Sequence, residues 1–278
     1  MKSNNELLIE TKSQVEHKKI DFNDFTINYY VSGDKDSNLV VFLHPAFSDH
    51  RAFEQQLDFF SKDFRVITID LIGHGLSQAN KSKDKIDSSI NHINKILETE
   101  GYSNAHFVGV SMGALIAQYY ALNYPEKIKS LTVLGSYNIN KENKEVAKAQ
   151  RGYNLNLMFR AVFSMKAFRK YAASVTAETE KAKAQFYEST SFYQRKSLLV
   201  MQGLQNVIKD RETTRPKYPL LILNGEHDID LAVKMAKEWH SEMENCKFEI
   251  IKGAGHCANM DNPEEFNKMV KSFIKENN

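Results

Sequence analysis

Hydrophobic residues collect in short runs along the chain, and longer stretches with a helical pattern separate most of these runs. The apolar runs lie at residues 39–43, 65–70, 105–109, 128–134, 220–223 and 247–251. They are rich in Val, Ile, Leu and Phe, which predicts strands that are buried on both faces. Between them, apolar residues recur at helical spacing, as at Ile86, Ile90 and Ile93. This spacing and the flanking residues predict helices at 51–60, 86–100, 112–122, 231–241 and 263–275.

The order of these elements predicts an α/β architecture. Residues 18–22 and 25–31 read as a hairpin that turns at Asn23 and Asp24. From residue 39 onward, strands and helices alternate. Alternation of apolar strands with helices predicts a mainly parallel sheet that helices cover on both faces.

Residues 137–215 interrupt the alternation. Pro125 and Pro216 bracket the stretch, and no proline lies between them. Apolar residues recur there at helical spacing, for example Leu155, Met158, Phe159, Val162 and Phe163 and, later, residues around Phe192, Leu199 and Val200. We therefore predict a helical insertion. Its methionine and aromatic side chains have two interpretations, a core of the insertion itself or the wall of an apolar pocket, and we favour the core.

Composition and charge narrow the class of protein. The chain has 278 residues, of which 42% are hydrophobic and 26% charged, as in ordinary globular domains. The formal net charge is +2 and no dense basic run occurs, so we expect no nucleic-acid partner. Residues 1–19 are polar, and no run approaches about 20 apolar residues. We therefore expect neither a secretory signal nor a membrane span, and we predict a cytoplasmic protein.

Cysteines and histidines give no sign of a disulfide framework or a metal site. The two cysteines, Cys246 and Cys257, are too few for a framework, and Cys257 reads as a small buried apolar residue. The nine histidines lack the H-E-x-x-H pattern and other paired metal spacings. We expect no metal and no cofactor.

A serine motif follows the strand at 105–109. Residues Gly109 to Gly113 read G-V-S-M-G, and a helix-forming stretch follows them. A serine between a strand and a helix needs a sharp turn, which the flanking glycines allow because they lack Cβ atoms. The turn lifts the Ser111 hydroxyl clear of the sheet, above the positive end of the helix. Ser111 is therefore the candidate nucleophile.

Two late segments supply the partners that a nucleophilic serine requires. Asp228 follows the strand at 220–223, and His256 follows the strand at 247–251 in a glycine-bearing loop. The carboxyl ends of parallel strands meet at one edge of a sheet, so Ser111, Asp228 and His256 should converge there. Neutral imidazole takes the serine proton, and a buried carboxylate fixes its tautomer. Asp230 is a rival for the acid, but Asp228 keeps the G-x-x-D spacing from Gly225.

These pieces together resemble the α/β-hydrolase superfamily. The resemblance covers nearly the whole chain from about Ile20, and its segments are L-H-P-A-F-S-D, D-L-I-G-H-G-L-S, G-V-S-M-G, G-E-H-D and G-A-G-H. The order Ser, Asp, His is the order of that family. The resemblance implies an α/β-hydrolase fold with a helical cap. Residues 1–136 and 216–278 would then form the core and residues 137–215 the cap.

The resemblance also implies an oxyanion hole built from the backbone N–H groups of Ala46 and Met112. Family members usually carry His-Gly at the end of the strand at 39–43, whereas this chain has His44-Pro45. Proline offers no N–H and fixes φ, so Phe47 N–H is the alternative donor. We interpret His44 as a residue that orients this loop and not as a second base.

The dehalogenases and epoxide hydrolases that this chain resembles carry aspartate at this turn. The serine of this chain therefore argues against both of these activities. The expected reaction is hydrolysis of a small, partly apolar ester, lactone or thioester through an acyl-enzyme. One alternative is cleavage of a carbon–carbon bond, or a related lyase reaction, on the same triad. Another is a receptor-like protein that keeps the triad to bind a ligand. A monomer or homodimer is expected.

Overall fold

The structure is a computed structural model that describes residues 14–22, 24–79, 83–142, 156–157, 160–212 and 216–278. The polar segment at residues 1–13 lies outside the described residues. So do Leu155, Met158 and Phe159 of the predicted helical pattern.

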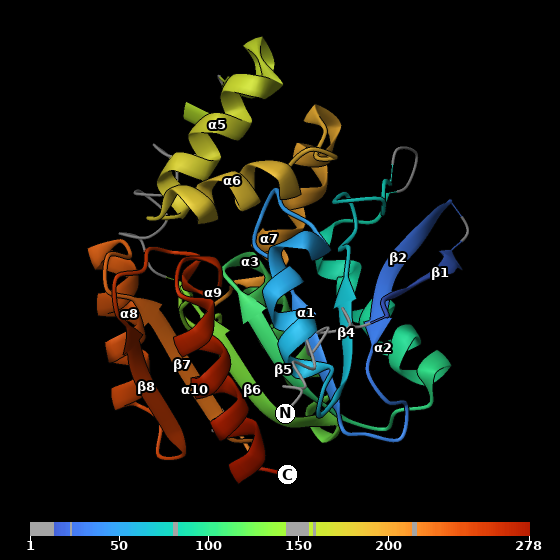
Figure 1. Cartoon of the computed structure of the whole chain (residues 1–278), viewed down its shortest axis with the longest axis vertical. Helices are drawn as coiled ribbons and strands as arrows, with labels where there is room; N and C mark the ends of the chain where they lie inside the picture. Colours follow the sequence, from blue (N-terminus) through green and yellow to red (C-terminus); the bar gives the residue numbers. More distant parts are fainter. Residues whose placement is uncertain (1–13, 23, 80–82, 143–155, 158–159, 213–215) are drawn as a thin grey trace, which may run out of the picture.

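One sheet of eight strands forms the centre of the fold, in the order β1-β2-β4-β3-β5-β6-β7-β8 (Figure 1). Strand β2 is antiparallel to β1 and β4, and the other neighbours pair in parallel. The prediction of a mainly parallel sheet is therefore confirmed. The strands are β1 Glu16–Phe22, β2 Phe25–Ser32, β3 Leu39–Leu43, β4 Arg65–Ile69, β5 Ala105–Val110, β6 Ile128–Leu134, β7 Leu220–Gly225 and β8 Cys246–Ile251.

Helices cover both faces of the sheet. They are α1 Glu54–Phe60, α2 Ser89–Glu100, α3 Met112–Asn123, α8 Asp230–Ser241, α9 Ala258–Asp261 and α10 Pro263–Glu276. Two helices expected as single elements begin instead with 3₁₀ turns, His50–Phe53 before α1 and Ile86–Ser88 before α2. The first of these turns forms because Asp49 accepts a hydrogen bond from the Arg51 N–H.

Two hydrophobic cores form because side chains alternate across each buried strand. Leu39, Val41 and Leu43 face the core that α2, α3 and α8 share, whereas Val40 and Phe42 face the core with α1 and α10. All five residues of β3 are buried, as its apolar sequence predicts.

The segment between β6 and β7 is helical and lies over the carboxyl ends of the parallel strands (Figure 1). It contains α5 Met165–Thr176, α6 Glu180–Ser189, the 3₁₀ helix Arg195–Gly203 and α7 Leu204–Val207. Its buried side chains include Phe168, Phe186 and Tyr193, which extend the core on the α1 and α10 side of the sheet. The core interpretation therefore holds for Phe168 and Tyr193, whereas Phe186 is a core residue that also lines the cavity containing Ser111.

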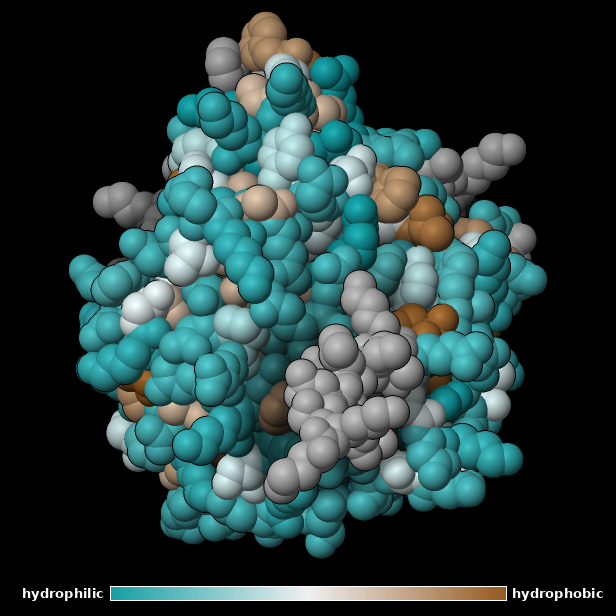
Figure 2. Space-filling view, viewed as in Figure 1, coloured by the Kyte–Doolittle hydropathy of each residue, from teal (hydrophilic) through white to brown (hydrophobic). Residues whose placement is uncertain are grey.

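The helical pattern does not bury every apolar side chain of this segment. Val162 and Phe163 lie in helical backbone but are 62% and 70% exposed. Phe192 and Leu199 are also exposed. In Figure 2 most of the visible face is hydrophilic, with small separate hydrophobic patches, one of them at the end of the molecule that carries α5. Within the described part of the chain, no helix combines the length and apolarity that a bilayer span requires.

Candidate active site

Ser111 occupies the sharp turn between β5 and α3. Its backbone has φ 51° and ψ −115°, in a region that non-glycine residues rarely adopt. The Ser111 N–H donates to the Leu134 carbonyl at 2.8 Å, which ties the turn to β6. A Cβ on Gly113 would lie 2.0 Å from the Leu43 carbonyl oxygen, and one on Gly109 would lie 2.5 Å from the Ala114 Cα. The motif glycines are needed because the backbone approaches this closely.

Asp228 and His256 come together at the ends of β7 and β8. Asp228 Oδ1 lies 2.9 Å from His256 Nδ1. The carboxylate also accepts hydrogen bonds from the Asn224 side chain at 2.9 Å and from the Ile229 N–H at 2.8 Å. These donors hold the carboxylate facing the imidazole. Asp230, the rival acid, is instead an exposed residue that opens α8.

The pair Asp228 and His256 shifts the pKa of both groups. Burial lowers the pKa of His256, but the charge of Asp228 and its hydrogen bond outweigh this effect, so the pKa is raised above 6.5. Burial raises the pKa of Asp228, but His256, Asn224 and the Ile229 N–H together lower it below its usual value. The carboxylate is therefore ionised and favours the protonated form of the imidazole.

The loop after β3 lies beside Ser111, and His44 holds it in place. His44 is fully buried. Its Nε2 accepts a hydrogen bond from the Leu71 N–H at 3.0 Å, so Nδ1 carries the proton and donates to the Pro45 carbonyl at 2.8 Å. Burial lowers the pKa of His44 and keeps it neutral. Both ring nitrogens are thus bound to backbone, in agreement with an orienting role.

The backbone N–H groups around this turn include the candidate oxyanion donors. Among the residues that the structure describes, the N–H groups of Ala46, Phe47 and Met112 have no hydrogen-bond acceptor. The Ser48 N–H already donates to the Pro45 carbonyl at 3.4 Å. Although Pro45 itself has no N–H, the N–H groups of Ala46 and Phe47 after it are both available to a ligand.

A cavity of about 340 Å³ contains Ser111 and His256 in its lining. Such a volume is at the lower end of the usual range for small-molecule sites. The loop after β3, the start of α8 and the segment between β6 and β7 all contribute to its walls. The lining residues are Pro45, Ala46, Phe47, Ser111, Leu115, Gly135, Ser136, Tyr137, Val175, Thr176, Phe186, Ile229, Leu231, Ala232, Met235 and His256.

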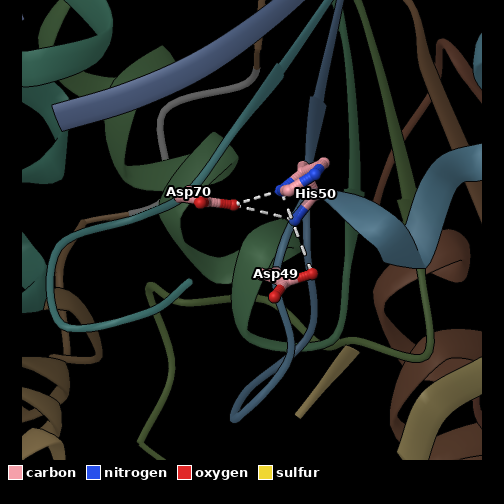
Figure 3. A group of neighbouring side chains, drawn as sticks. All are labelled: Asp49, His50 and Asp70. Atoms are coloured by element: carbon pink, nitrogen blue, oxygen red, sulfur yellow. Dashed lines mark hydrogen bonds and ion pairs between the residues drawn. The ribbon is translucent and has the colours of Figure 1, made fainter. Parts of the chain in front are cut away.

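A second carboxylate–imidazole group lies at the end of the loop after β3. Asp49, His50 and Asp70 offer ligand atoms within 4.8 Å of one another (Figure 3). Asp70 accepts hydrogen bonds from the His50 N–H at 2.9 Å, from His50 Nδ1 at 2.8 Å and from the Leu76 N–H at 2.8 Å. Asp49 accepts from the backbone and guanidinium of Arg51. Because protein donors engage both carboxylates, we assign this group to holding together the loops after β3 and β4.

Cys257 and two arginines of the segment between β6 and β7 have structural surroundings. Cys257 is fully buried and burial raises the pKa of its thiol well above the usual value, as expected of a packing residue. Two arginines of the segment between β6 and β7 bind backbone carbonyls of the same segment. Arg169 donates to the Ser191 carbonyl at 2.5 Å and Arg195 to the Ala161 carbonyl at 2.6 Å.

Comparison with known proteins finds hydrolases. Epoxide hydrolase 4 of Homo sapiens is 25% identical over 279 residues, covering 90% of this chain and 75% of that protein. 3-Oxoadipate enol-lactonase 1 of Acinetobacter baylyi is 25% identical over 274 residues, covering 90% of this chain and 93% of the lactonase.

Solved structures and a family model agree with these relatives. A thermophilic esterase from Thermogutta terrifontis matches with a TM-score of 0.79 at 16% identity, covering 94% of this chain and 98% of that chain, which shows a shared fold. The model of the alpha/beta hydrolase fold family matches residues 38–263. Because this match spans most of the sequence, the chain belongs to the alpha/beta hydrolase fold family.

Proposed function

We propose that the protein is a serine hydrolase that cleaves a small, partly apolar carboxylic ester, lactone or thioester through an acyl-enzyme. One observation carries the proposal: Ser111, in a strained turn, lines the same cavity as His256, whose Nδ1 is bound to Asp228. A serine hydroxyl becomes a nucleophile when an oriented imidazole accepts its proton.

In the proposed mechanism Ser111 Oγ attacks the carbonyl carbon of the substrate while His256 accepts the hydroxyl proton. The oxyanion that forms accepts hydrogen bonds from the N–H groups of Ala46 and Met112. His256 then returns the proton to the leaving group, and a water molecule, activated by the same imidazole, hydrolyses the acyl-enzyme. Asp228 stabilises the imidazolium at each step. No step requires a metal or a cofactor.

The serine at the turn supports an acyl substrate over the epoxide named for some of the relatives. Epoxide hydrolases of the family are expected to use an aspartate at this position, and this chain has Ser111. An acyl substrate therefore fits better than an epoxide. The apolar residues of the cavity, among them Leu115, Leu231 and Met235, suit an alkyl or similar apolar group.

We also infer that residues 137–215 act as a cap over this site, between a first core part at 1–136 and a second at 216–278. Val175, Thr176 and Phe186 of α5 and α6 support this inference, because they line the same cavity as Ser111. Limited proteolysis that cuts within 137–215 and leaves both core parts intact would support the division.

The test is covalent labelling together with turnover. A serine-directed phosphonate should modify Ser111, located by peptide mass spectrometry, and the protein should hydrolyse p-nitrophenyl esters. Ser136 lines the same cavity and provides the matched control, because Ser136→Ala should still take up the label. Labelling without turnover of esters, lactones or thioesters would favour a ligand-binding protein, and turnover of a vinylogous 1,5-diketone instead would favour carbon–carbon cleavage.

A further inference from the structure

The loop that carries a proposed oxyanion donor contains a second strained residue. Phe47 has φ 71°, and it and Ser111 are the two non-glycine residues with positive φ among the described residues. Phe47 occupies the third position of the turn that the Ser48 N–H closes on the Pro45 carbonyl. Glycine is the usual residue at a turn position with positive φ, and for a bulky residue this conformation persists only when the surroundings hold it.

Two aromatic rings from the segment above the sheet surround Phe47. The Phe168 ring lies at a centroid distance of 5.2 Å from the Phe47 ring, and the Tyr193 ring also lies at 5.2 Å, both edge to face. Phe168 and Tyr193 stack on each other at 5.8 Å, and both are almost completely buried. The Phe47 ring is therefore fixed between residues of the segment 137–215.

Polar contacts fasten the same loop to the same segment. Ser48 Oγ donates to Ser189 Oγ at 2.9 Å, in a buried position. Arg51 donates to Ser191 Oγ at 2.8 Å, and its carbonyl accepts from the Gln185 side chain at 3.0 Å. Loop and segment are thus joined at the ring of Phe47 and at the residues that follow it.

We propose that Phe168 and Tyr193 are positioning residues that hold Phe47 in its left-handed conformation and thereby direct the peptide N–H groups of the turn at the oxyanion. The inference rests on the proposed function, and it adds that the cap completes the catalytic site. When the cap moves away, the turn relaxes and loses its donors. If the cap only contacted the substrate, changes in the cap would mainly alter KM. If the cap holds the oxyanion donors in place, changes in the cap should mainly alter kcat.

The first experiment compares two substitutions at Tyr193. Within the described residues the Tyr193 hydroxyl has no hydrogen-bond partner, so Tyr193→Phe keeps the ring and should keep kcat. Tyr193→Leu removes the ring and should lower kcat by about 10- to 100-fold, with a much smaller change in KM. Complete loss of one oxyanion donor costs about 10²–10³, and a misdirected donor should cost less. Equal kcat values for two folded variants would overturn the proposal.

The second experiment leaves the cap untouched and changes Phe47. Phe47→Gly and Phe47→Ala lose the same ring contacts, but only glycine adopts positive φ without strain. We expect Phe47→Gly to keep a kcat at least about tenfold above that of Phe47→Ala. In the Phe47→Gly background, Tyr193→Leu should then cost little. If Phe47→Gly and Phe47→Ala have the same kcat, the backbone conformation of this turn does not matter and the proposal fails.

The outcomes separate this proposal from the proposed function. Activity that survives Ser111→Ala would refute the serine mechanism itself. The positioning role alone would be refuted if activity requires Ser111 but is unchanged by Tyr193→Leu and is the same with glycine and with alanine at position 47. Thermal denaturation of each variant shows whether it is folded, and the comparison at position 47 stands even if Tyr193→Leu does not fold.

Discussion

A Cβ atom on Gly135 would lie 2.9 Å from both Cε1 and Nδ1 of His256. Gly135 follows β6, has φ 61° and donates its N–H to the Leu223 carbonyl at 2.9 Å, so its backbone is fixed against β7. The imidazole therefore occupies the space that a side chain on this residue would take. The position of His256 depends on the absence of that side chain as well as on Asp228.

We predict that Gly135→Ala lowers kcat by about 10²-fold, because a displacement of roughly 1 Å in a reacting group has an effect of that order. KM for a p-nitrophenyl ester should change less. The measurement is steady-state kinetics on a variant whose thermal unfolding is still cooperative.

Gly101→Ala is the control for backbone strain. Gly101 has φ 81° at the end of α2, and a Cβ there would contact nothing within 4 Å. This variant should lose stability, since alanine is strained at positive φ, and should keep its kcat. Equal loss of kcat in both variants would mean that strain, and not the contact with His256, explains the effect at Gly135.

Ser111→Ala should lower kcat by about 10⁴–10⁶, as in other serine triads, without unfolding the protein. The alanine keeps the Cβ and the backbone contacts of the turn, and only Oγ is lost. Circular dichroism and thermal denaturation check the fold, and a sensitive fluorogenic ester measures residual turnover. A folded variant with a tenth of the wild-type activity would rule out Ser111 as the nucleophile.

Asp228→Asn and Asp230→Asn should differ strongly. Asp228 faces His256 at 2.9 Å, whereas Asp230 is exposed at the start of α8. In a serine protease the equivalent change costs about 10⁴ in kcat, because the imidazole takes the wrong tautomer. We expect a loss of that order for Asp228→Asn and a kcat near wild type for Asp230→Asn. A large loss in Asp230→Asn with a kcat near wild type in Asp228→Asn would show that Asp230, and not Asp228, is the acid of the triad.

Activity should depend on the length of the acyl chain. The cavity of about 340 Å³ has Leu115, Leu231 and Met235 in its wall. One methylene in an apolar pocket discriminates by about 1–3 kcal/mol, so kcat/KM should pass through a maximum between acetate and octanoate esters. Met235→Ala should move that maximum to a longer chain. A flat profile for both proteins would show that these residues only pack the core.

The strands, and the meeting of Ser111, Asp228 and His256 at one edge of the sheet, could be predicted from short sequence patterns. Apolar runs such as the one at 39–43 predict buried strands, and a parallel sheet brings the carboxyl ends of β5, β7 and β8 to one edge. Asp228 and His256 meet there because each follows directly on its strand. The G-x-x-D spacing favours Asp228 over Asp230 in the sequence, and in the structure Asp228 is buried and faces His256 whereas Asp230 is exposed.

Features that depend on contacts between distant segments could not be predicted. The sequence around Phe47 contains no glycine, and its positive φ depends on rings of Phe168 and Tyr193, which come much later in the chain. Helical spacing at Val162 predicts a helix but does not say what covers its apolar side chains, and those of Val162 and Phe163 are exposed. Arg169 bonds to a carbonyl that only the folded segment brings within reach.

The pH dependence of kcat/KM should show one limb, with its midpoint above 6.5. Burial lowers the pKa of His256, but the charge of Asp228 and its hydrogen bond raise it further, and the net shift is upward from 6.5. Since only neutral imidazole accepts the proton of Ser111, activity is lost below this pKa and rises as the pH increases through it. In Asp228→Asn both raising effects disappear while burial remains, so the midpoint of the residual activity should fall below that of wild type. Asp230→Asn should keep the wild-type midpoint. A wild-type midpoint at or below 6.5, or one that Asp228→Asn leaves unchanged, would show that the limb does not report His256 paired with Asp228.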